Sequence, residues 1–326
     1  MKNSSITQLS IPGLNIEDTN RYPHISVCDI PSDLPIVVSY GGGKNSTALL
    51  EGMWLKKIVP DAIIFADTGN EHPWTYDFIQ WYNSVLVERG FPSITVVRYK
   101  MKKTKPRKKV AYSLPKWSLS KDGFSSRLIY SLLSFHYFRQ YYKYQSLGEE
   151  CVVLQGLPSP SYSNRHSCSD KWKIKPIEQF IKENYTQEIQ LWVGIHAGET
   201  SRLFTKSGNK KDYYIPGFGY KAYPLVDWGI YQKHCESLLN FSLAKQPQKS
   251  SCWFCPYSKP AEVRHLKSTH PDLYQVGVNL ELSAKTTTAT LGKNFSWSEI
   301  QSTEAESVYR LSSRDIAPSS CGCVDL

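Results

Sequence analysis

Short apolar runs alternate with segments of helical periodicity through the middle of the chain. Runs rich in β-branched residues predict strands at residues 36–40, 62–67, 94–99, 151–157 and 189–197. Helical spacing of apolar residues predicts helices at 45–59, 73–88 and 125–145, and a further helix that begins at Pro176. This order predicts an α/β fold in which a parallel five-stranded sheet is flanked by helices, as in Rossmann-like domains.

The regular alternation also suggests how the chain is divided. Residues 35–240 carry the alternation, and we predict that they form a nucleotide-binding α/β domain. Residues 1–34 are polar and predict an N-terminal arm. Residues 241–326 contain the sequence CWFC and a stretch rich in Ser and Thr. We expect these residues to form a small, mainly helical, cysteine-bearing region packed on the core.

The composition is that of a globular protein. Of the 326 residues, 40% are hydrophobic and 13% are aromatic, which is more apolar surface than a disordered chain carries. No apolar run reaches the roughly 18 residues that a membrane helix needs, and the first residues lack the apolar core of a signal peptide. We therefore expect a soluble, cytoplasmic protein with no membrane partner.

Positive charge predicts a polyanionic partner. The chain has 39 Lys and Arg against 29 Asp and Glu, a net charge of +10, and surface cations gain most by displacing counterions from phosphates. Residues 98–109, RYKMKKTKPRKK, contain eight basic residues and no acidic one. Such a run is either a solvated loop or a nucleic-acid contact. In the second case the contacts come from Lys102, Lys103, Lys105, Arg107, Lys108 and Lys109.

The strongest local signal is the sequence IVVSYGGGKNSTALL, a predicted strand followed by three glycines and the start of a helix. Glycines let the backbone approach a ligand, and a helix N-terminus offers unpaired N–H groups to an anion. The order predicts a phosphate cradle, with an ordinary glycine-rich turn as the alternative. It differs from a Walker loop, because Val38 stands at the first glycine position and Asn45 follows the lysine.

Six blocks in one order resemble a known family, the PP-loop ATP pyrophosphatases of the adenine nucleotide α-hydrolase type, in their phosphoadenylylsulfate (PAPS) reductase-like branch. The family signature SGGKDS is similar to residues 39–46, with Tyr40 inserted and Asn45 in place of the usual Asp. The other blocks are FADTGNEHPWTYDFI (65–79), CSDKWKIKPIEQFI (168–181), GIHAGETSRL (194–203), YPLVDWGI (223–230) and SCWFCPY (251–257).

The resemblance implies a HUP-type α/β fold that binds ATP with Mg²⁺ and cleaves it between the α and β phosphates, with Lys44 and Ser46 as catalytic residues. Asn45 departs from the family pattern, because a neutral amide cannot supply the carboxylate that the usual Asp would offer to the metal. In the alternative interpretation, Asp67 only caps the turn after its strand, and Glu199 only forms a surface ion pair with Arg202. The implied nucleotide-binding residues are Ser39, Gly41, Gly42, Gly43, Lys44, Asn45, Ser46 and Thr47, with Asp67 and Thr68 near the purine and Glu199 and Arg202 over the phosphates.

The cysteines suggest metal or sulfur chemistry, because disulfides are rare in the cytosol. Cys252 and Cys255 have the C-x-x-C spacing of ligands for zinc or an iron–sulfur cluster. Cys168 and Cys235 are the candidates for a third and fourth ligand, although Cys235 also fits a buried helical thiol. The resemblance favours a [4Fe–4S] cluster over zinc. The remaining thiols are interpreted as structural at Cys28 and Cys151, and as a sulfur relay or an ordinary chain end at Cys321 and Cys323.

These observations predict an ATP pyrophosphatase that adenylates an oxygen of a nucleic acid for replacement by sulfur. The resemblance favours the backbone phosphate of DNA, as in phosphorothioation systems of the Dnd and Ssp type, with a cysteine desulfurase as sulfur donor and with further subunits of the modification system. The alternatives are tRNA thiolation, reduction of adenylyl sulfate or PAPS, and a non-catalytic nucleic-acid-binding module. Ser169 after Cys168 disfavours the reductase, which uses a tandem Cys-Cys in its iron–sulfur form.

Overall fold

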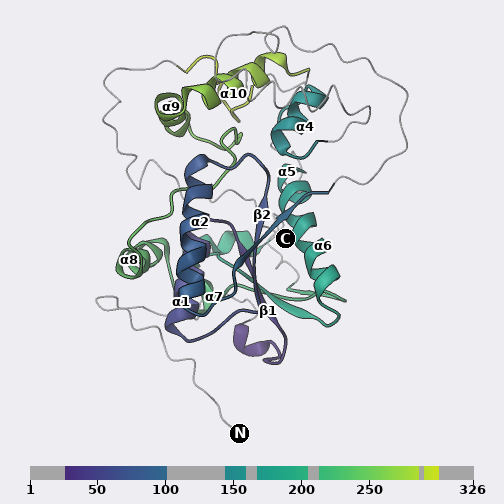
Figure 1. Cartoon of the computed structure of the whole chain (residues 1–326), viewed down its shortest axis with the longest axis vertical. Coiled ribbons are helices and arrows are strands. Elements are labelled where there is room, and N and C mark those ends of the chain that lie inside the picture. The colour runs from purple at the N-terminus through teal and green to yellow at the C-terminus, as the bar shows by residue number, and fades with distance from the viewer. Residues whose placement is uncertain (1–25, 101–143, 159–166, 205–212, 286–289, 301–326) are drawn as a thin grey trace.

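The computed structural model describes residues 26–100, 144–158, 167–204, 213–285 and 290–300 (Figure 1). Within them lies a sheet of six strands in the order β3-β2-β1-β4-β6-β5. The strands are β1 (Ile36–Tyr40), β2 (Ala62–Asp67), β3 (Ile94–Arg98), β4 (Ile189–Val193), β5 (Tyr214–Ile215) and β6 (Gly219–Ala222). All neighbouring pairs are parallel except β5 with β6. The predicted α/β fold with a Rossmann-like parallel sheet is therefore confirmed.

The sheet reverses its strand order beside β1. Val38 of β1 is in register with Ile63 of β2 on one side and with Trp192 of β4 on the other. From β1 the chain continues to β2 on one side, whereas β4 and the strands after it lie on the other side. The loops that follow β1 and β4 therefore diverge and flank a crevice. In open α/β sheets, ligands bind in such a crevice at the carboxyl ends of the strands.

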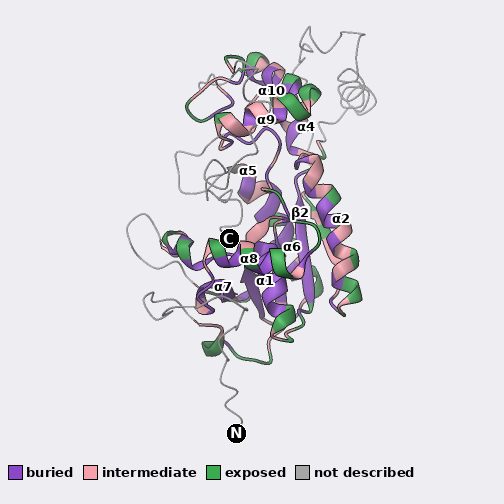
Figure 2. Cartoon of the chain, turned by 90° about the vertical axis from the view of Figure 1, so that its left-hand side faces the viewer, coloured by how far each residue is buried: buried purple, intermediate pink, exposed green. Residues whose placement is uncertain are grey.

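Alternate side chains of the strands enter two different cores, because successive residues of a strand point to opposite faces of the sheet. In β2, Ile63 and Phe65 pack into the core that we call the α1 core, whereas Ile64 and Ala66 pack into the α6 core. Figure 2 shows β2, inside the sheet, as buried, and exposed residues on the outward side of helix α2. The sheet is thus the middle layer of three.

Helices cover both faces of the sheet (Figure 1). Side chains of α1 (Lys44–Leu55), α2 (Pro73–Glu88) and α8 (Gln232–Ser242) form the α1 core with the sheet. Those of α6 (Lys175–Asn184) form the α6 core on the opposite face. Three short helices complete this part of the chain: η1 (Val27–Asp29), η4 (Ala197–Leu203) and α7 (Pro224–Asp227).

A third core, the C-terminal core, lies beyond the carboxyl end of β2. Its largest fully buried side chains are Trp172, Trp297 and Phe254. It contacts the turn after β2, where Leu147 N–H donates to Thr68 O at 3.0 Å. The elements that contribute are α4 (Leu147–Leu154), α5 (Ser167–Ser169), η3 (Asp170–Ile174), α9 (Pro260–Thr269) and α10 (Pro271–Ser283).

The strand predicted at residues 151–157 is wrong, because the chain forms helix α4 there. Ser146 caps the helix by accepting the Glu149 N–H at 3.2 Å, and Glu149 and Glu150 lie in the first turn, where acidic residues favour the helix dipole. The apolar run of Cys151, Val152 and Val153 was too short to separate a buried strand from a buried helix. Cys151 therefore lies in a helix and does not begin a strand.

The fifth parallel strand is β6, which sequence patterning did not predict. Its sequence, GYKA, is short and contains no β-branched residue. Gly219 is required there, because its φ is +116° and an added Cβ would lie 2.1 Å from Ile189 O. The predicted helix at 125–145 falls largely outside the described residues.

The described part of the predicted N-terminal arm joins the α/β domain. Ile30 is buried in the α1 core, and Val27 N–H donates to Asp227 Oδ2 at 2.9 Å. In the described part of the chain, no helix combines the length and the hydropathy needed to cross a membrane. The division at residue 240 stays a prediction; α4 and η3, which precede it, share the C-terminal core with the residues that follow it.

Candidate active site

The glycine loop connects β1 to α1 at the crevice. Gly42 has a φ of +71°, which favours glycine, and an added Cβ would lie 3.0 Å from Ile79 of α2. Ser46 Oγ accepts the Gly41 N–H at 3.2 Å and donates to Gly43 O at 3.1 Å. Thr47 Oγ1 also donates to Gly43 O, at 2.8 Å. These bonds hold the loop in a compact turn over the first N–H groups of α1.

The loop after β4 closes the other side of the crevice. A Cβ at Gly194 would lie 2.7 Å from Ser46 Cα and 2.8 Å from Ser46 N, so only glycine allows this approach to the start of α1. Ser39, which is in β1, is buried between the two neighbouring strands. The predicted binding residues of β1, the glycine loop and α1 are therefore together at one position of the sheet.

Two carboxylates contact the start of α1. Lys44 Nζ forms an ion pair with Glu236 Oε1 of α8 at 2.9 Å, and each side chain is about a third exposed, at 32% and 30%. Asn45 Nδ2 donates to Glu199 Oε2 at 3.0 Å. Position 45 itself carries no carboxylate, but Glu199 places a negative charge directly beside it.

Glu199 also forms an ion pair with Arg202 inside η4 and lies near His196, the residue before η4. Its Oε2 lies 3.6 Å from Arg202 Nη1 and 3.6 Å from His196 Nε2. The side chains of Glu199 and Arg202 are only 7% and 16% exposed. The predicted ion pair of Glu199 with Arg202 is therefore real, but it is buried beside Asn45 and is not a surface pair. Burial lowers the pKa of His196, an effect that Glu199 opposes and Arg202 reinforces.

Asp67 uses its carboxylate to hold the turn after β2. Its Oδ1 accepts from Gly69 N–H and from the Tyr76 hydroxyl, each at 2.7 Å, and its Oδ2 accepts from Arg98 Nε at 2.8 Å. The side chain is 1% exposed. The structure shows the turn-capping alternative for Asp67, and a contact of Asp67 or Thr68 with a purine stays a prediction.

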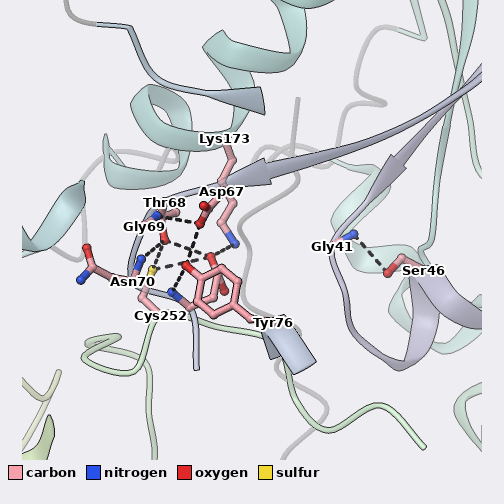
Figure 3. A network of polar contacts seen from close by, with 10 residues as sticks. Gly41, Ser46, Asp67, Thr68, Gly69, Asn70, Tyr76, Lys173 and Cys252 are labelled. Carbon is pink, nitrogen blue, oxygen red and sulfur yellow. Dashed lines mark hydrogen bonds and ion pairs between the residues drawn. The ribbon is translucent and has the colours of Figure 1, made fainter. Parts of the chain in front are cut away.

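A second polar group lies at this same turn, and Figure 3 shows it in one view with Gly41 and Ser46. Glu71 Oε1 forms a buried ion pair with Lys173 Nζ at 2.9 Å and accepts from Thr68 Oγ1 at 3.1 Å. Cys252 Sγ lies 3.2 Å from Thr68 Oγ1 and 3.8 Å from Glu71 Oε1. We call Thr68, Glu71, Lys173 and Cys252 the Glu71 network.

Burial keeps the thiols of this region protonated, whereas the neighbouring carboxylate of Glu71 keeps its lysine charged. Burial raises the pKa of Cys252 well above the usual value, and Glu71 raises it further, although Lys173 acts in the opposite direction. It raises the pKa of Cys255 to about 11. Burial alone lowers the pKa of Lys173, but Glu71 and Cys252 outweigh it, and the net pKa is raised.

The structure brings three of the four predicted thiol ligands into one neighbourhood. Cys168 and Cys252 pack against the C-terminal core, and Cys168 acts electrostatically on Cys255. Cys151 also belongs to this core and interacts electrostatically with Cys168. Cys235 is not with them, because it is fully buried in the α1 core, where Glu199 and Glu236 are its acidic neighbours.

Thiol proximity alone does not make a metal site here. Among the described residues, no three His, Cys, Asp or Glu side chains are close enough together to hold a metal ion. The donor chemistry suits zinc or an iron–sulfur cluster, but the side chains as arranged do not converge on one point. The arrangement therefore does not fit a preformed metal centre.

One segment, residues 249–252, touches both the glycine loop and the Glu71 network. At its glycine-loop end, a Cβ at Gly43 would lie 2.7 Å from Ser250 Oγ. At its other end, Cys252 forms an antiparallel bridge with Glu71. Between the two, Ser251 O accepts the His72 N–H at 3.0 Å. The predicted phosphate cradle and the predicted cysteine region are thus physically joined.

Several residues of the site were missed by sequence reasoning. Glu71 and Lys173 lie inside two of the quoted blocks, but nothing in the sequence pairs them across about a hundred positions. The sequence predicts a strand at Cys151, and Ser250 lies one residue before the quoted block SCWFCPY (251–257). The predicted nucleic-acid contacts and two further thiols lie outside the described residues: Lys102, Lys103, Lys105, Arg107, Lys108, Lys109, Cys321 and Cys323.

Comparison with known proteins gives limited matches. No family model matches the chain. Over 136 residues, 40% of this chain, the sequence is 27% identical to the uncharacterized protein MJ0066 of Methanocaldococcus jannaschii, of which the match covers 28%. A solved structure, the U34-tRNA thiolase NcsA from Methanococcus maripaludis with its [4Fe-4S] cluster, aligns over 88% of this chain and 80% of its own, with 14% identity and a TM-score of 0.37.

Proposed function

We propose that the chain is an ATP pyrophosphatase that transfers AMP to an oxygen of a nucleic acid, so that sulfur can replace that oxygen. The observation that carries the proposal is the segment 249–252, which contacts the glycine loop through Ser250 and the Glu71 network through Cys252. A phosphate cradle joined to a group of thiols suits a reaction in which ATP activates a site and sulfur then enters it.

Each residue of the cradle has a role in this proposal. The N–H groups of the glycine loop and of the first turn of α1 bind the pyrophosphate as it leaves. Lys44 exchanges Glu236 for a phosphate oxygen and neutralises the charge that develops there. Ser46 keeps the loop closed through Gly41 and Gly43.

Mg²⁺ enters the proposal with the nucleotide, because it is usually held by one or two carboxylates together with substrate phosphates. Glu199 is the carboxylate beside Asn45 that would hold it. Bound there, the ion would neutralise charge on the phosphates. Arg202, paired with Glu199, would keep this carboxylate in place.

The cysteine region is proposed as the place where sulfur is received. A cysteine desulfurase would supply sulfur as a persulfide. Iron, sulfide and zinc analysis of anaerobically purified protein, with Cys252→Ala alongside, tests for the predicted [4Fe–4S] cluster or zinc. Wild-type protein without any of the three elements would exclude both.

The nucleic acid is proposed from the net charge of +10. DNA phosphorothioation places sulfur on a backbone phosphate, and tRNA thiolation places it on a base. Mass spectrometry of DNA and tRNA from cells with and without the gene distinguishes the two. If neither phosphorothioate linkages nor thiolated bases depend on the gene, the sulfur-transfer part of the proposal is wrong.

The ATP reaction is tested with purified protein. We expect release of AMP and pyrophosphate, and a decrease of about 100-fold or more in Lys44→Ala, because one lost electrostatic contact to the transition state typically costs this much. Lys182→Ala, an exposed lysine of α6, is the matched control. Release that is unchanged in Lys44→Ala would contradict the assignment of the glycine loop.

A further inference from the structure

Ser250 faces the glycine loop from outside the motif. Its Oγ is the nearest atom to a Cβ built on Gly43, at 2.7 Å, and its own Cβ is the next, at 3.5 Å. The hydroxyl of Ser250, more than two hundred positions along the chain, thus occupies the space that a side chain at position 43 would need. A serine hydroxyl can donate a hydrogen bond, and here it lies directly against the glycine loop.

Thr75 of α2 faces the same loop. Its Cγ2 would lie 3.1 Å from a Cβ at Gly42, so its side chain is in contact with the loop. The side chain is 2% exposed, yet Oγ1 has no hydrogen-bond partner. A buried hydroxyl without a partner is costly to a fold and is commonly explained by a ligand or a water.

We propose that Ser250 and Thr75 form a second wall of the phosphate cradle and donate hydrogen bonds to the terminal phosphates of the nucleotide. This inference rests on the proposed function and adds two binding residues from outside the glycine motif. The ligand class is pyrophosphate, free or as the β and γ phosphates of a nucleoside triphosphate. Donation to a charged phosphate oxygen makes these bonds stronger than neutral ones.

The position of Ser250 also links nucleotide binding to Cys252. Ser251 is held to α2 by the bond from His72 N–H, and Cys252 is paired with Glu71 through the antiparallel bridge. Only one residue, Ser251, separates Ser250 from Cys252, and both Ser251 and Cys252 are anchored by these contacts. A phosphate that fixes Ser250 therefore also restrains Cys252.

Pyrophosphate binding, measured by isothermal titration calorimetry, tests the second wall. We expect the Kd to rise about tenfold in Ser250→Ala and in Thr75→Val, as for the loss of one hydrogen bond to a charged group. Thr75→Val keeps the shape of the side chain and removes only a hydroxyl without a partner, so the thermal midpoint should not fall. Ser237→Ala, an exposed serine of α8 that bonds only Lys233 O, is the control and should bind as wild type.

The link to Cys252 is tested by alkylation with iodoacetamide, followed by mass spectrometry. Saturating pyrophosphate should slow the modification of Cys252 in the wild type. In Ser250→Ala, measured at a higher pyrophosphate concentration that saturates the variant, this protection should be lost. Equal protection in the two proteins would contradict the link.

The outcomes separate this inference from the proposed function. Wild-type Kd values in both Ser250→Ala and Thr75→Val overturn the second wall, even if Lys44→Ala abolishes ATP cleavage. Weaker pyrophosphate binding in both variants supports the second wall, even if the wild type releases no pyrophosphate from ATP. A wild type that does not bind pyrophosphate overturns both.

Discussion

The glycine loop and the Glu71 network lie at the ends of neighbouring strands, yet they are built in opposite ways. The loop consists of consecutive residues, and its hydrogen bonds span five positions or fewer. The network joins residues that are far apart in the chain, as Glu71 to Lys173 and Thr68 to Cys252. Local geometry defines the first site, and tertiary packing defines the second.

Burial separates the two regions as clearly as chain distance does. The ion pair at the glycine loop, Lys44 with Glu236, has both side chains about a third exposed, at 32% and 30%. In the network, Glu71 is 0% exposed and Lys173 is 10% exposed. A partly exposed pair contributes little to stability and can exchange partners. A buried pair cannot lose one member without leaving a charge in a medium of low dielectric constant.

The largest expected effect is on the buried pair. Lys173→Met removes the cation and leaves Glu71 charged and buried, which should lower the free energy of unfolding by about 3–5 kcal/mol. Urea denaturation measures this. The double variant Glu71→Gln with Lys173→Met should recover most of the loss, because no unpaired charge then remains. If the single variant is within about 1 kcal/mol of wild type, as for an exposed ion pair, the buried pair is not a structural element.

His72, which donates its backbone N–H to the segment between the two regions, gives a pH-dependent effect of intermediate size. Its pKa is lowered to about 3 by burial and by the nearby Lys249, His270 and His265. In the unfolded chain His72 has the ordinary histidine pKa of about 6.5. Below this pH the unfolded chain therefore takes up a proton at His72 that the folded chain does not. The free energy of unfolding should therefore fall by about 1.4 kcal/mol per pH unit on this account, down to the folded pKa.

His72→Phe keeps an aromatic ring to stack on Trp74, as His72 does at 3.9 Å between ring centroids, and removes this titration. Between pH 6.5 and pH 4.5, the wild type should lose about 2–3 kcal/mol more stability than the variant. Urea unfolding at both pH values measures the difference, in which the other titrating groups largely cancel. Parallel losses in the two proteins would contradict a buried neutral His72.

The contrast between the regions also explains what the sequence could predict. Strands β1 to β4, the glycine loop and the C-x-x-C pair were predictable, because each depends on periodicity or on spacing within a short stretch, whereas the short β6 carries no such signal. The helix at Cys151 and the partner of Lys173 were not, because packing of the C-terminal core determines both. Asp67 and Glu199 were correctly placed near the strand ends, but their partners, Tyr76 and Asn45, required the structure.

The smallest expected effect on stability is at the glycine loop. Glu236→Gln removes the charge that holds Lys44 but keeps the shape of the side chain, and the cost in unfolding free energy should be about 1 kcal/mol or less. ATP should bind more tightly to this variant, because Lys44 no longer leaves a carboxylate when it meets a phosphate. Asp170→Asn breaks a similar pair with Lys175, at 3.2 Å, and is the control for a general loss of negative charge. Tighter ATP binding in Glu236→Gln, but not in Asp170→Asn, would show that Lys44 exchanges Glu236 for a phosphate. Weaker ATP binding in Glu236→Gln would contradict this exchange. It would show instead that Glu236 positions Lys44 or holds Mg²⁺, and that the ion pair is part of the nucleotide site.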